Sequence, residues 1–144
     1  MNFVLDVNPL LAALIKDSTC RNIIINSELN FCFPEPALQK IRKYKDYIIQ
    51  KSGFSELEYN VMLHTLLRFI RIIPAEEIMQ HWDEAKLIME QIDPEDVLFI
   101  ATALGQDEAA IWTDDTHFDK QDKIINLKTK DIIKLLKDRS EGAR

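Results

Sequence analysis

Residues 110–119 read Ala-Ile-Trp-Thr-Asp-Asp-Thr-His-Phe-Asp, an apolar run followed directly by the acidic pair Asp114 and Asp115. The chain opens in a similar way, because residues 3–5 are Phe-Val-Leu and Asp6 follows them. Each apolar run is typical of a short buried strand. Ligands bind outside the carboxyl ends of strands in open α/β sheets, so acids at two strand ends predict a shared site. Because clustered carboxylates repel one another, we expect a divalent cation such as Mg²⁺ or Mn²⁺ there.

The size and composition of the chain predict one compact domain. With 144 residues, 47% of them hydrophobic, the chain is long enough to bury a full core. We expect residues 1–139 to form this domain and residues 140–144 to be a flexible tail. No apolar segment reaches the roughly 20 residues that span a bilayer, and no signal-peptide pattern opens the chain, which predicts a cytoplasmic protein. The wide spacing of Cys20 and Cys32 predicts free thiols.

The net charge of −6 argues against a protein that binds nucleic acid through overall positive charge. A nuclease is still compatible with this charge, because metal-binding acids lower the total. The acids concentrate in residues 76–96, which hold eight acids and one lysine. Basic residues concentrate in residues 40–45 and in residues 120–139, and the second range contains seven basic residues and three acidic ones. A solvated helix face is the simpler interpretation of each run.

Strand and helix signals alternate along the chain and predict its fold class. Ser55 to Glu58 has the form of a capping box, Gly53 and Gly105 end helices, and Thr129 is expected to cap the last helix. Strands separated by helices require a mainly parallel sheet that is covered on both faces. We therefore predict a three-layer α/β/α sandwich with about five strands. The expected strands are 3–6, 31–33, 72–73, 110–113 and 124–126, and the expected helices are 9–16, 19–27, 34–52, 55–70, 75–90, 93–104 and 129–137.

Four segments together resemble the PIN domain, a small α/β nuclease fold found in many prokaryotic toxins and RNA-processing proteins. They are residues 3–8 (Phe-Val-Leu-Asp-Val-Asn), the helix opening at Pro34, residues 93–104 and residues 111–118. Their order and spacing carry the resemblance, which spans nearly the whole chain. It implies metal-dependent hydrolysis of phosphodiester bonds, usually in RNA, with acids that hold Mg²⁺ or Mn²⁺ near the scissile phosphate.

The resemblance also implies the residues of the site. Asp6, Asp96 and Asp115 match the acids of the family and are expected to be catalytic and to bind the metal. Supporting roles are expected for Asn8, Thr113, Asp93, Asp114 and Glu35. Other residues near these acids are expected to be structural, with His117 on the surface, Phe118 in the core and Asp119 in a turn.

Helix-end chemistry offers a structural alternative for several of these acids. Asp6 or Asn8 would serve as the N-cap of the helix that begins near Pro9, and Asn8 is the better candidate. Asp93 as N-cap and Asp96 in the first turn would likewise be expected from helix-end electrostatics alone. A metal site would additionally show an affinity that falls below about pH 5, where protons compete for ordinary carboxylates.

One position departs from the family pattern. Where the family usually supplies a glutamate, this chain has Gln39-Lys40, which places a positive charge among the acids. Glu35 would substitute from the start of the same helix. Alternatively, Lys40 contacts an RNA phosphate, together with Arg42 and Lys43, and leaves the metal to the three aspartates.

Several functional classes remain to be distinguished. A haloacid-dehalogenase phosphatase needs an acid at the position of Asn8, and a receiver domain needs an acid after residues 71–73, so both fit poorly. The main alternative to a ribonuclease is a PIN-like binding module for RNA or protein that has lost its chemistry. A third interpretation is a toxin with an antitoxin partner. The resemblance also implies a possible homodimer, for which the helices over residues 57–70 and 78–89 carry enough apolar side chains.

Overall fold

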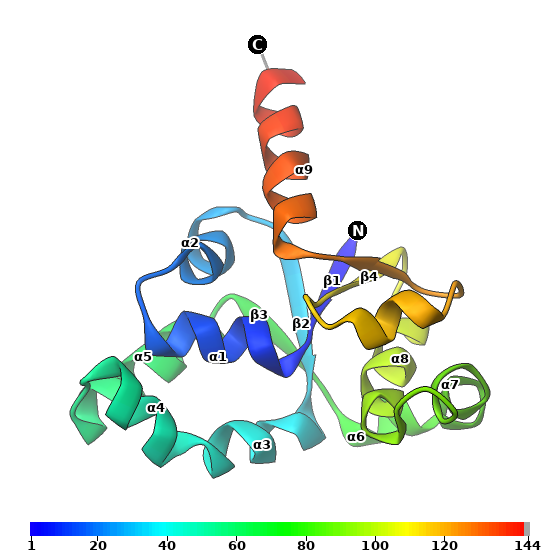
Figure 1. The fold of residues 1–144 in the computed structure, drawn as a ribbon, viewed down its shortest axis with the longest axis horizontal. Coiled ribbons are helices and arrows are strands. Elements are labelled where there is room, and N and C mark those ends of the chain that lie inside the picture. Colours follow the sequence, from blue (N-terminus) through cyan, green and yellow to red (C-terminus); the bar gives the residue numbers. More distant parts are fainter. Residues whose placement is uncertain (143–144) are drawn as a thin grey trace.

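The computed structural model describes residues 1–142, and a sheet of five strands forms its centre (Figure 1). The strand order is β3-β2-β1-β4-β5, and every neighbouring pair is parallel. The predicted α/β class and the five-stranded parallel sheet are confirmed. The strands are β1 (Asn2–Leu5), β2 (Asn30–Pro34), β3 (Ile70–Ile73), β4 (Ala109–Trp112) and β5 (Ile125–Leu127).

Helices cover both faces of the sheet and complete the predicted three-layer sandwich. Helices α1 to α5 lie on one side of the strands in Figure 1, and α6 to α8 lie on the other. Right-handed crossovers explain this division, because the chain moves outward from β1 to β3 and then returns to β4. The first group is α1 (Val7–Ile15), α2 (Thr19–Asn26), the short helix η1 (Glu35–Ala37), α3 (Leu38–Lys43), α4 (Lys45–Ser52) and α5 (Glu56–Leu67); the second is α6 (Ala75–Met79), α7 (Trp82–Met89), η2 (Pro94–Asp96) and α8 (Val97–Leu104).

The core lies on the two faces of the strands. Parallel strands are buried on both faces and therefore consist of nearly continuous apolar residues. Phe3 pairs in register with Phe31 on one side and with Ala110 on the other. The rings of Phe3 and Phe31 are 6.1 Å apart, and those of Phe31 and Trp112 are 5.8 Å apart. These contacts fix β1 between β2 and β4, and they therefore also fix the position of Asp6, which follows β1.

The direction of the chain across the sheet reverses between β1 and β4. The connection after β1 leads to β2 and β3, whereas β4 adds to the opposite edge of β1. Such a reversal leaves a crevice at the carboxyl ends of the two central strands, where open α/β sheets bind ligands. Asp6 follows β1, and Thr113 and Asp115 follow β4, so these three residues lie at the crevice.

Local sequence signals account for several helix ends. Ser55 accepts a hydrogen bond from the Glu58 backbone and Glu58 accepts one from the Ser55 backbone, which confirms the predicted capping box. Gly53 ends α4 with a φ of 76°, a left-handed conformation that glycine adopts without a steric cost. Phe118 is fully buried, as predicted.

Three predicted helices are each divided in the structure, and the one expected over residues 93–104 begins as the short helix η2 and continues as α8. The helix expected over residues 34–52 forms η1, α3 and α4, because Tyr44 leaves helical geometry with a ψ of 10°. The helix expected over residues 75–90 forms α6 and α7, with a break at Gln80 and His81. The His81 ring lies where a side chain on Gly105 would project, only 3.0 Å from that position. Packing of His81 against the end of α8 therefore accompanies the break.

The structure also differs from the prediction at Ile70, at Thr129 and at the end of the last helix. Ile70 belongs to β3 and pairs with Phe31, because sheet pairing outweighs the apolar helical spacing that assigned it to the preceding helix. The last helix, α9 (Thr129–Gly142), continues beyond residue 139, so residues 140–142 are helical; residues 143–144 lie outside the described part. Thr129 is its first helical residue, and its hydroxyl donates to Asp114 rather than capping the helix.

The two cysteines are free thiols, as predicted, with Cys20 half-buried and Cys32 buried. Burial raises the pKa of the Cys32 thiol to about 11, so it stays protonated at neutral pH. Within residues 1–142, no helix has the length and apolar character required to cross a bilayer.

Candidate metal centre

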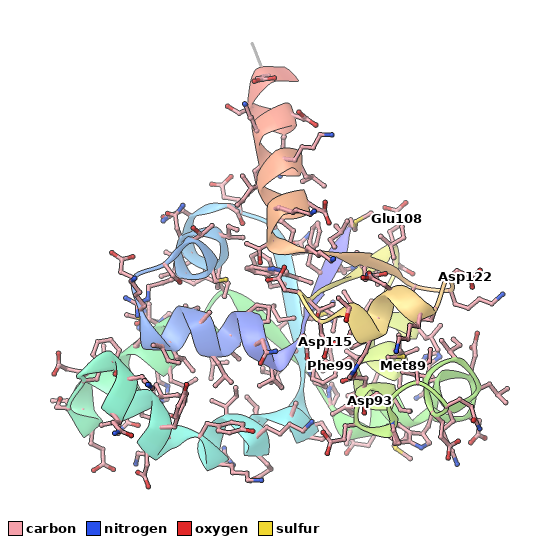
Figure 2. All side chains as sticks on the ribbon, viewed as in Figure 1. Met89, Asp93, Phe99, Glu108, Asp115 and Asp122 are labelled. Carbon is pink, nitrogen blue, oxygen red and sulfur yellow. The ribbon has the colours of Figure 1, made fainter. Side chains whose placement is uncertain are left out.

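A cleft of about 300 Å³ opens at the carboxyl ends of β1 and β4. Three of its lining residues, Asp93, Phe99 and Asp115, are labelled in Figure 2 and gather near the centre of the molecule. Its lining combines acidic side chains with cationic and neutral polar ones. The acidic side chains are Asp6, Asp93, Glu95, Asp96 and Asp115, and the others include Asn8, Lys40, Lys43 and Tyr44.

Asp6 is held rigidly at the base of the cleft. Its backbone N–H donates to the carbonyl of Trp112 at 3.0 Å, which extends the pairing of β1 with β4 by one residue. Its Oδ1 accepts from the N–H of Val7 and its Oδ2 from the hydroxyl of Thr113, both at 2.8 Å. Asp6, rather than Asn8, is thus the N-cap of α1. Burial raises the pKa of Asp6, although the two hydrogen bonds oppose this change.

Asp96 is the acid whose negative charge receives the least stabilisation from neighbouring groups. It ends η2 and is only 8% exposed, and its Oδ2 has no hydrogen-bond partner among the described residues. Burial, followed by the charges of Asp93, Asp6 and Asp115, raises the pKa of Asp96 to about 7. Nearby His117 opposes this rise. A buried anionic oxygen without a donor is costly unless a cation approaches it.

Thr113 links two of the acids. Its side chain is fully buried, and its hydroxyl donates to Asp6 and accepts the backbone N–H of Asp115 at 3.0 Å. Asp115 then caps the short helix η3 (Thr116–Lys120), because its Oδ1 accepts the N–H of His117 at 2.9 Å. The hydroxyl of Thr113 thus orients Asp6 and sets the start of the turn that carries Asp115.

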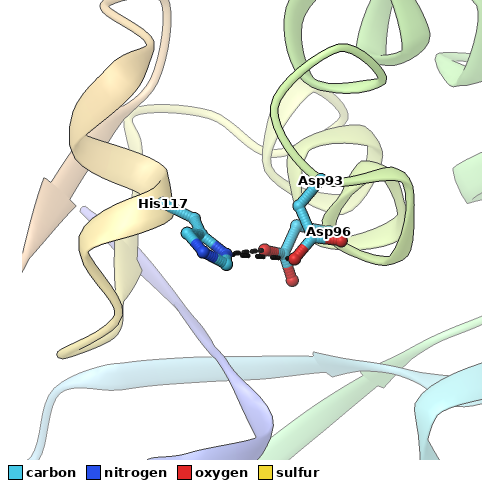
Figure 3. A group of neighbouring side chains, drawn as sticks. All are labelled: Asp93, Asp96 and His117. Atoms are coloured by element: carbon cyan, nitrogen blue, oxygen red, sulfur yellow. Dashed lines mark hydrogen bonds and ion pairs between the residues drawn. The ribbon is translucent and has the colours of Figure 1, made fainter.

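His117 completes a cluster with Asp93 and Asp96 (Figure 3). Its Nδ1 lies 3.0 Å from Asp93 Oδ2, 3.8 Å from Asp96 Oδ2 and 3.5 Å from Asp115 Oδ1. An ionised carboxylate only accepts hydrogen bonds, so we assign the ring hydrogen to Nδ1, from which it is donated to Asp93. The His117 side chain is 44% exposed, yet it lies inside the acid cluster rather than apart from it.

This donor set fits a hard divalent cation. Asp93, Asp96 and His117 each offer a ligand atom, and the three atoms lie within 4.8 Å of one another. A histidine nitrogen binds a cation only when it carries no hydrogen, so Nδ1 can serve as a ligand only in place of its hydrogen bond to Asp93. The unpartnered Oδ2 of Asp96 points to the same requirement, because a cation would balance both this oxygen and the repulsion among neighbouring carboxylates. Carboxylate oxygens are the ligands that Mg²⁺ favours, and imidazole is accepted by Mn²⁺ and softer transition metals.

Lys40 brings a positive charge into the cleft, as the departure at Gln39-Lys40 predicts. It extends from α3, and its Nζ lies 5.9 Å from the centroid of the Phe99 ring. Its charge lowers the pKa of Asp6, but less than burial raises it. Lys40 is therefore close enough to influence the acids while forming no salt bridge within 4 Å in residues 1–142.

Three residues with predicted supporting or RNA-contacting roles lie outside the cleft. Glu35 and Arg42 line a separate surface depression beside η1 and α3. Glu35 therefore does not line the cleft with the other acids. Asp114 accepts the backbone N–H and the hydroxyl of Thr129, at 2.9 and 2.8 Å, and so secures the start of α9. The remaining predicted residues, Asp6, Asn8, Lys40, Lys43, Asp93, Asp96 and Asp115, line the cleft, and Thr113 supports it from beneath.

The sequence did not predict that Glu95 and Tyr44 line the cleft, or that His117 joins the acid cluster beside it. A local signal existed for His117, because an aspartate often accepts the backbone N–H two residues later and thereby turns the chain. Asp93 and Asp115 both make this contact, with Glu95 and His117 respectively. Glu95 and His117 are thus placed by the same kind of turn.

Comparisons with known proteins agree with this architecture. Residues 4–132 match the sequence profile of a family described as PIN domain. A chain in the crystal structure of VapBC2 from Rickettsia felis, bound to a DNA fragment from their promoter, has a similar fold with a TM-score of 0.66. It is 18% identical in sequence, and the similarity covers 89% of this chain and 98% of that chain. No curated protein matches the sequence significantly. Because the family profile spans the sheet from β1 into α9, this chain belongs to the PIN domain family.

Proposed function

We propose that the chain is a metal-dependent endoribonuclease that hydrolyses RNA phosphodiester bonds. The observation that carries this proposal is the buried Asp96 Oδ2, which has no hydrogen-bond partner among residues 1–142 and faces a cluster of other acids. A protein that used this corner only for folding would gain stability by replacing the acid with an apolar residue. Membership of the PIN domain family supports the nuclease class, and the class of substrate is our proposal.

We assign the metal, Mg²⁺ or Mn²⁺, to Asp6, Asp96 and Asp115, with Asp93 and His117 beside them. When bound, such a cation polarises a phosphoryl oxygen and lowers the pKa of water. The protein residues provide orientation. The Thr113 hydroxyl donates to Asp6 and thereby orients it, and His117 contacts Asp93 through its Nδ1. No covalent nucleophile is needed for this reaction class.

The test is cleavage of a mixed-sequence single-stranded RNA with Mn²⁺ or Mg²⁺ by the wild-type chain and by Asp6→Asn. We expect cleavage that needs the metal and is lost in Asp6→Asn, while circular dichroism shows a folded protein. Asp119→Asn is the matched control, because Asp119 lies in η3 outside the cleft and bonds to Asn126. Absence of cleavage and of Mn²⁺ binding in the wild type would instead favour a PIN-like binding module that has lost its chemistry.

We further propose that the protein is the toxin of a toxin–antitoxin pair in the cytoplasm. The similarity to a chain of VapBC2, a structure that includes promoter DNA, supports a partner protein for this chain as well. Induced expression is expected to stop bacterial growth, and Asp6→Asn is expected to relieve the arrest. Arrest that persists with Asp6→Asn would reject toxicity by RNA cleavage.

A homodimer is a separate proposal. Leu57 and Val61 are exposed on α5, and Met79 and Leu87 are exposed on α6 and α7. Leu57 and Val61 are one turn apart on α5, so their exposed side chains are neighbours and form a candidate contact surface. Sedimentation equilibrium is expected to give twice the 16.8 kDa mass of the chain. A single species at 16.8 kDa would reject the dimer.

A further inference from the structure

Cationic and aromatic side chains share one face of the segment formed by α3 and α4. We call Lys40, Lys43, Tyr44, Tyr47 and Lys51 the Lys–Tyr face. Their spacing places them within about 100° around a helix axis, given 3.6 residues per turn. The helical path continues through the break, because the Tyr44 N–H donates to the Lys40 carbonyl and the Tyr44 carbonyl accepts the N–H of Ile48. The face is therefore one continuous surface.

Both tyrosines of this face present their rings to solvent. Tyr44 is 41% exposed and Tyr47 is 48% exposed, whereas Ile41 and Ile48 are the buried residues of the same helices. The two tyrosine rings lie 6.5 Å apart at an interplanar angle of 68°. The ammonium of Lys51 lies 5.8 Å from the centre of the Tyr47 ring. The core needs neither ring, so their exposure calls for another explanation.

The lysines of the face differ from Lys45, which lies on the same segment. Lys45 pairs with Glu56 and lies 5.9 Å from the centre of the Tyr59 ring, so it joins α4 to α5. In contrast, Lys40, Lys43 and Lys51 take part in none of the salt bridges within 4 Å in residues 1–142. Their charges are available to an anion from outside the chain.

The Lys–Tyr face leads directly into the candidate metal centre. Lys40, Lys43 and Tyr44 line the cleft that holds Asp6 and Asp96. A polyanion that approaches the acids must first overcome their repulsion in a chain with a net charge of −6. A local cationic strip beside the acids supplies that attraction. Aromatic rings between the cations add a surface on which nucleobases stack.

We propose that the Lys–Tyr face binds single-stranded RNA and guides it into the cleft. Lys40 and Lys43 contact phosphates beside the reacting bond, one base stacks on Tyr44, the next base stacks on Tyr47, and Lys51 contacts a phosphate farther along. The RNA must be single-stranded, because a duplex hides the base faces that the tyrosines would contact. The placement of the reacting bond rests on the proposed nuclease function, but binding to the face does not.

The proposal is tested by fluorescence anisotropy with a labelled 12-nucleotide single-stranded RNA and Mg²⁺. All variants are made in the Asp6→Asn chain, so that the RNA stays intact. Tyr44→Ala is expected to weaken binding about 10-fold and Tyr44→Phe to leave it nearly unchanged, because base stacking needs the aromatic ring and not its hydroxyl. Lys43→Gln and Lys51→Gln are each expected to reduce the slope of log K against log salt by about 0.7.

Arg42→Gln is the matched control, because Arg42 lies on the same helix but lines the depression beside Glu35. Arg42→Gln is expected to change the RNA affinity less than about twofold, because salt screens a surface charge that lies far from any bound phosphate. Equal losses in Arg42→Gln and Lys43→Gln, equal affinity of Tyr44→Ala and Tyr44→Phe, or tighter binding of duplex RNA would each overturn the proposal. So would the absence of any RNA binding.

Cleavage assays separate this proposal from the nuclease proposal. If Tyr44→Ala in the otherwise wild-type chain raises KM and leaves kcat unchanged, both proposals are supported. Metal-dependent cleavage with an unchanged KM in Tyr44→Ala would reject the Lys–Tyr face and retain the nuclease. RNA binding that depends on Tyr44, in a chain that never cleaves, would retain the face and reject the nuclease.

Discussion

Aspartates gather at two neighbouring corners of the sheet, but only one corner supplies a hydrogen-bond donor to every carboxylate. The acid corner consists of Asp6 after β1, Asp115 after β4, and Asp93 and Asp96 at the two ends of η2. The capping corner consists of Asp114, Asp119 and Asp131 around β5 and the start of α9. Every carboxylate of the capping corner has a donor: Thr129 for Asp114, Asn126 and Lys128 for Asp119, and the Lys128 backbone for Asp131. In the acid corner, Asp96 Oδ2 has none among residues 1–142.

The difference shows that position, rather than residue type, decides what an aspartate contributes. Asp114 and Asp115 are adjacent in sequence, yet Asp114 anchors α9 and Asp115 turns toward the cleft. Hydrogen-bonded aspartates at helix starts add stability, whereas buried and mutually repelling ones reduce it. We therefore expect substitutions in the acid corner to remove activity and those in the capping corner to remove stability.

The largest effect is expected for Asp96→Asn. Loss of this carboxylate is predicted to lower the RNA cleavage rate about 10³-fold, equivalent to ~4 kcal/mol, because metal catalysis contributes several kcal/mol. Mn²⁺ affinity, measured by calorimetry, is expected to fall with it. Asp119→Asn in the capping corner should keep both properties. Equal losses in the two variants would remove the distinction between the corners.

The metal-free protein is expected to lose stability as pH rises through the acid corner's titration. The pKa of Asp96 is about 7 in the folded chain and 3.8 in its reference state. The folded state therefore binds more protons than the unfolded state between these values, and the free energy of unfolding falls as pH rises from about 4 to about 7. The change is on the order of 2–4 kcal/mol. Urea unfolding of the wild type and of Asp96→Asn measures it, and parallel pH profiles would contradict the assignment.

The same titration sets the pH at which metal binding fails. Protons compete with the cation for Asp96, so Mn²⁺ affinity is expected to decline as pH falls below about 7. Ordinary carboxylates would place this decline near pH 5, as the sequence alone predicts. The burial of Asp96 explains the upward shift. An affinity that stays constant from pH 7 to about pH 5 would show that Asp96 is not a ligand.

The fold was predictable because its strands are short apolar runs between helix signals. Parallel strands leave this pattern wherever helices cover both faces, and β1 and β4 show it clearly. The helix breaks at Tyr44 and His81 were not predictable, because no glycine or proline marks either position. His81 packs against Gly105, which lies in a later element, and apolar periodicity contains no information about such contacts.

The site was predictable in part, for a related reason. Asp6, Asp96 and Asp115 could be identified because their motifs occur in family order at strand ends and a helix start. The turn at Asp115 is a local signal for the backbone position of His117. The contact of the His117 ring with Asp93 could not be predicted, because it joins positions 24 apart and depends on how η3 packs beside η2. The different directions of Asp114 and Asp115 also depend on packing, since Thr129 draws Asp114 toward α9.

Thr113 and Thr129 form a matched pair, with one threonine in each corner. The buried hydroxyl of Thr113 orients Asp6 and Asp115 in the acid corner. Thr113→Val keeps the shape of the side chain but removes both hydrogen bonds. Because residues that orient metal ligands typically contribute 10–100-fold, we expect Mn²⁺ affinity and cleavage to fall by about that factor. Unchanged affinity in a folded Thr113→Val protein would show that Asp6 needs no such support.

Thr129→Val is the counterpart in the capping corner and has the smallest expected effect. The Thr129 hydroxyl accepts from Trp112 Nε1 at 3.0 Å and donates to Asp114 Oδ2 at 2.8 Å. Its removal leaves the buried Trp112 without that acceptor and should lower the free energy of unfolding by about 1–2 kcal/mol. Cleavage by the folded protein should remain within about twofold of wild type, since Asp115 keeps its bond to Thr113. Trp112 and Thr113 are consecutive in the chain. A large loss of activity in Thr129→Val would therefore mean that the loss of the Trp112 hydrogen bond shifts the end of β4 and with it Thr113. The acid corner and the capping corner would then act as one unit.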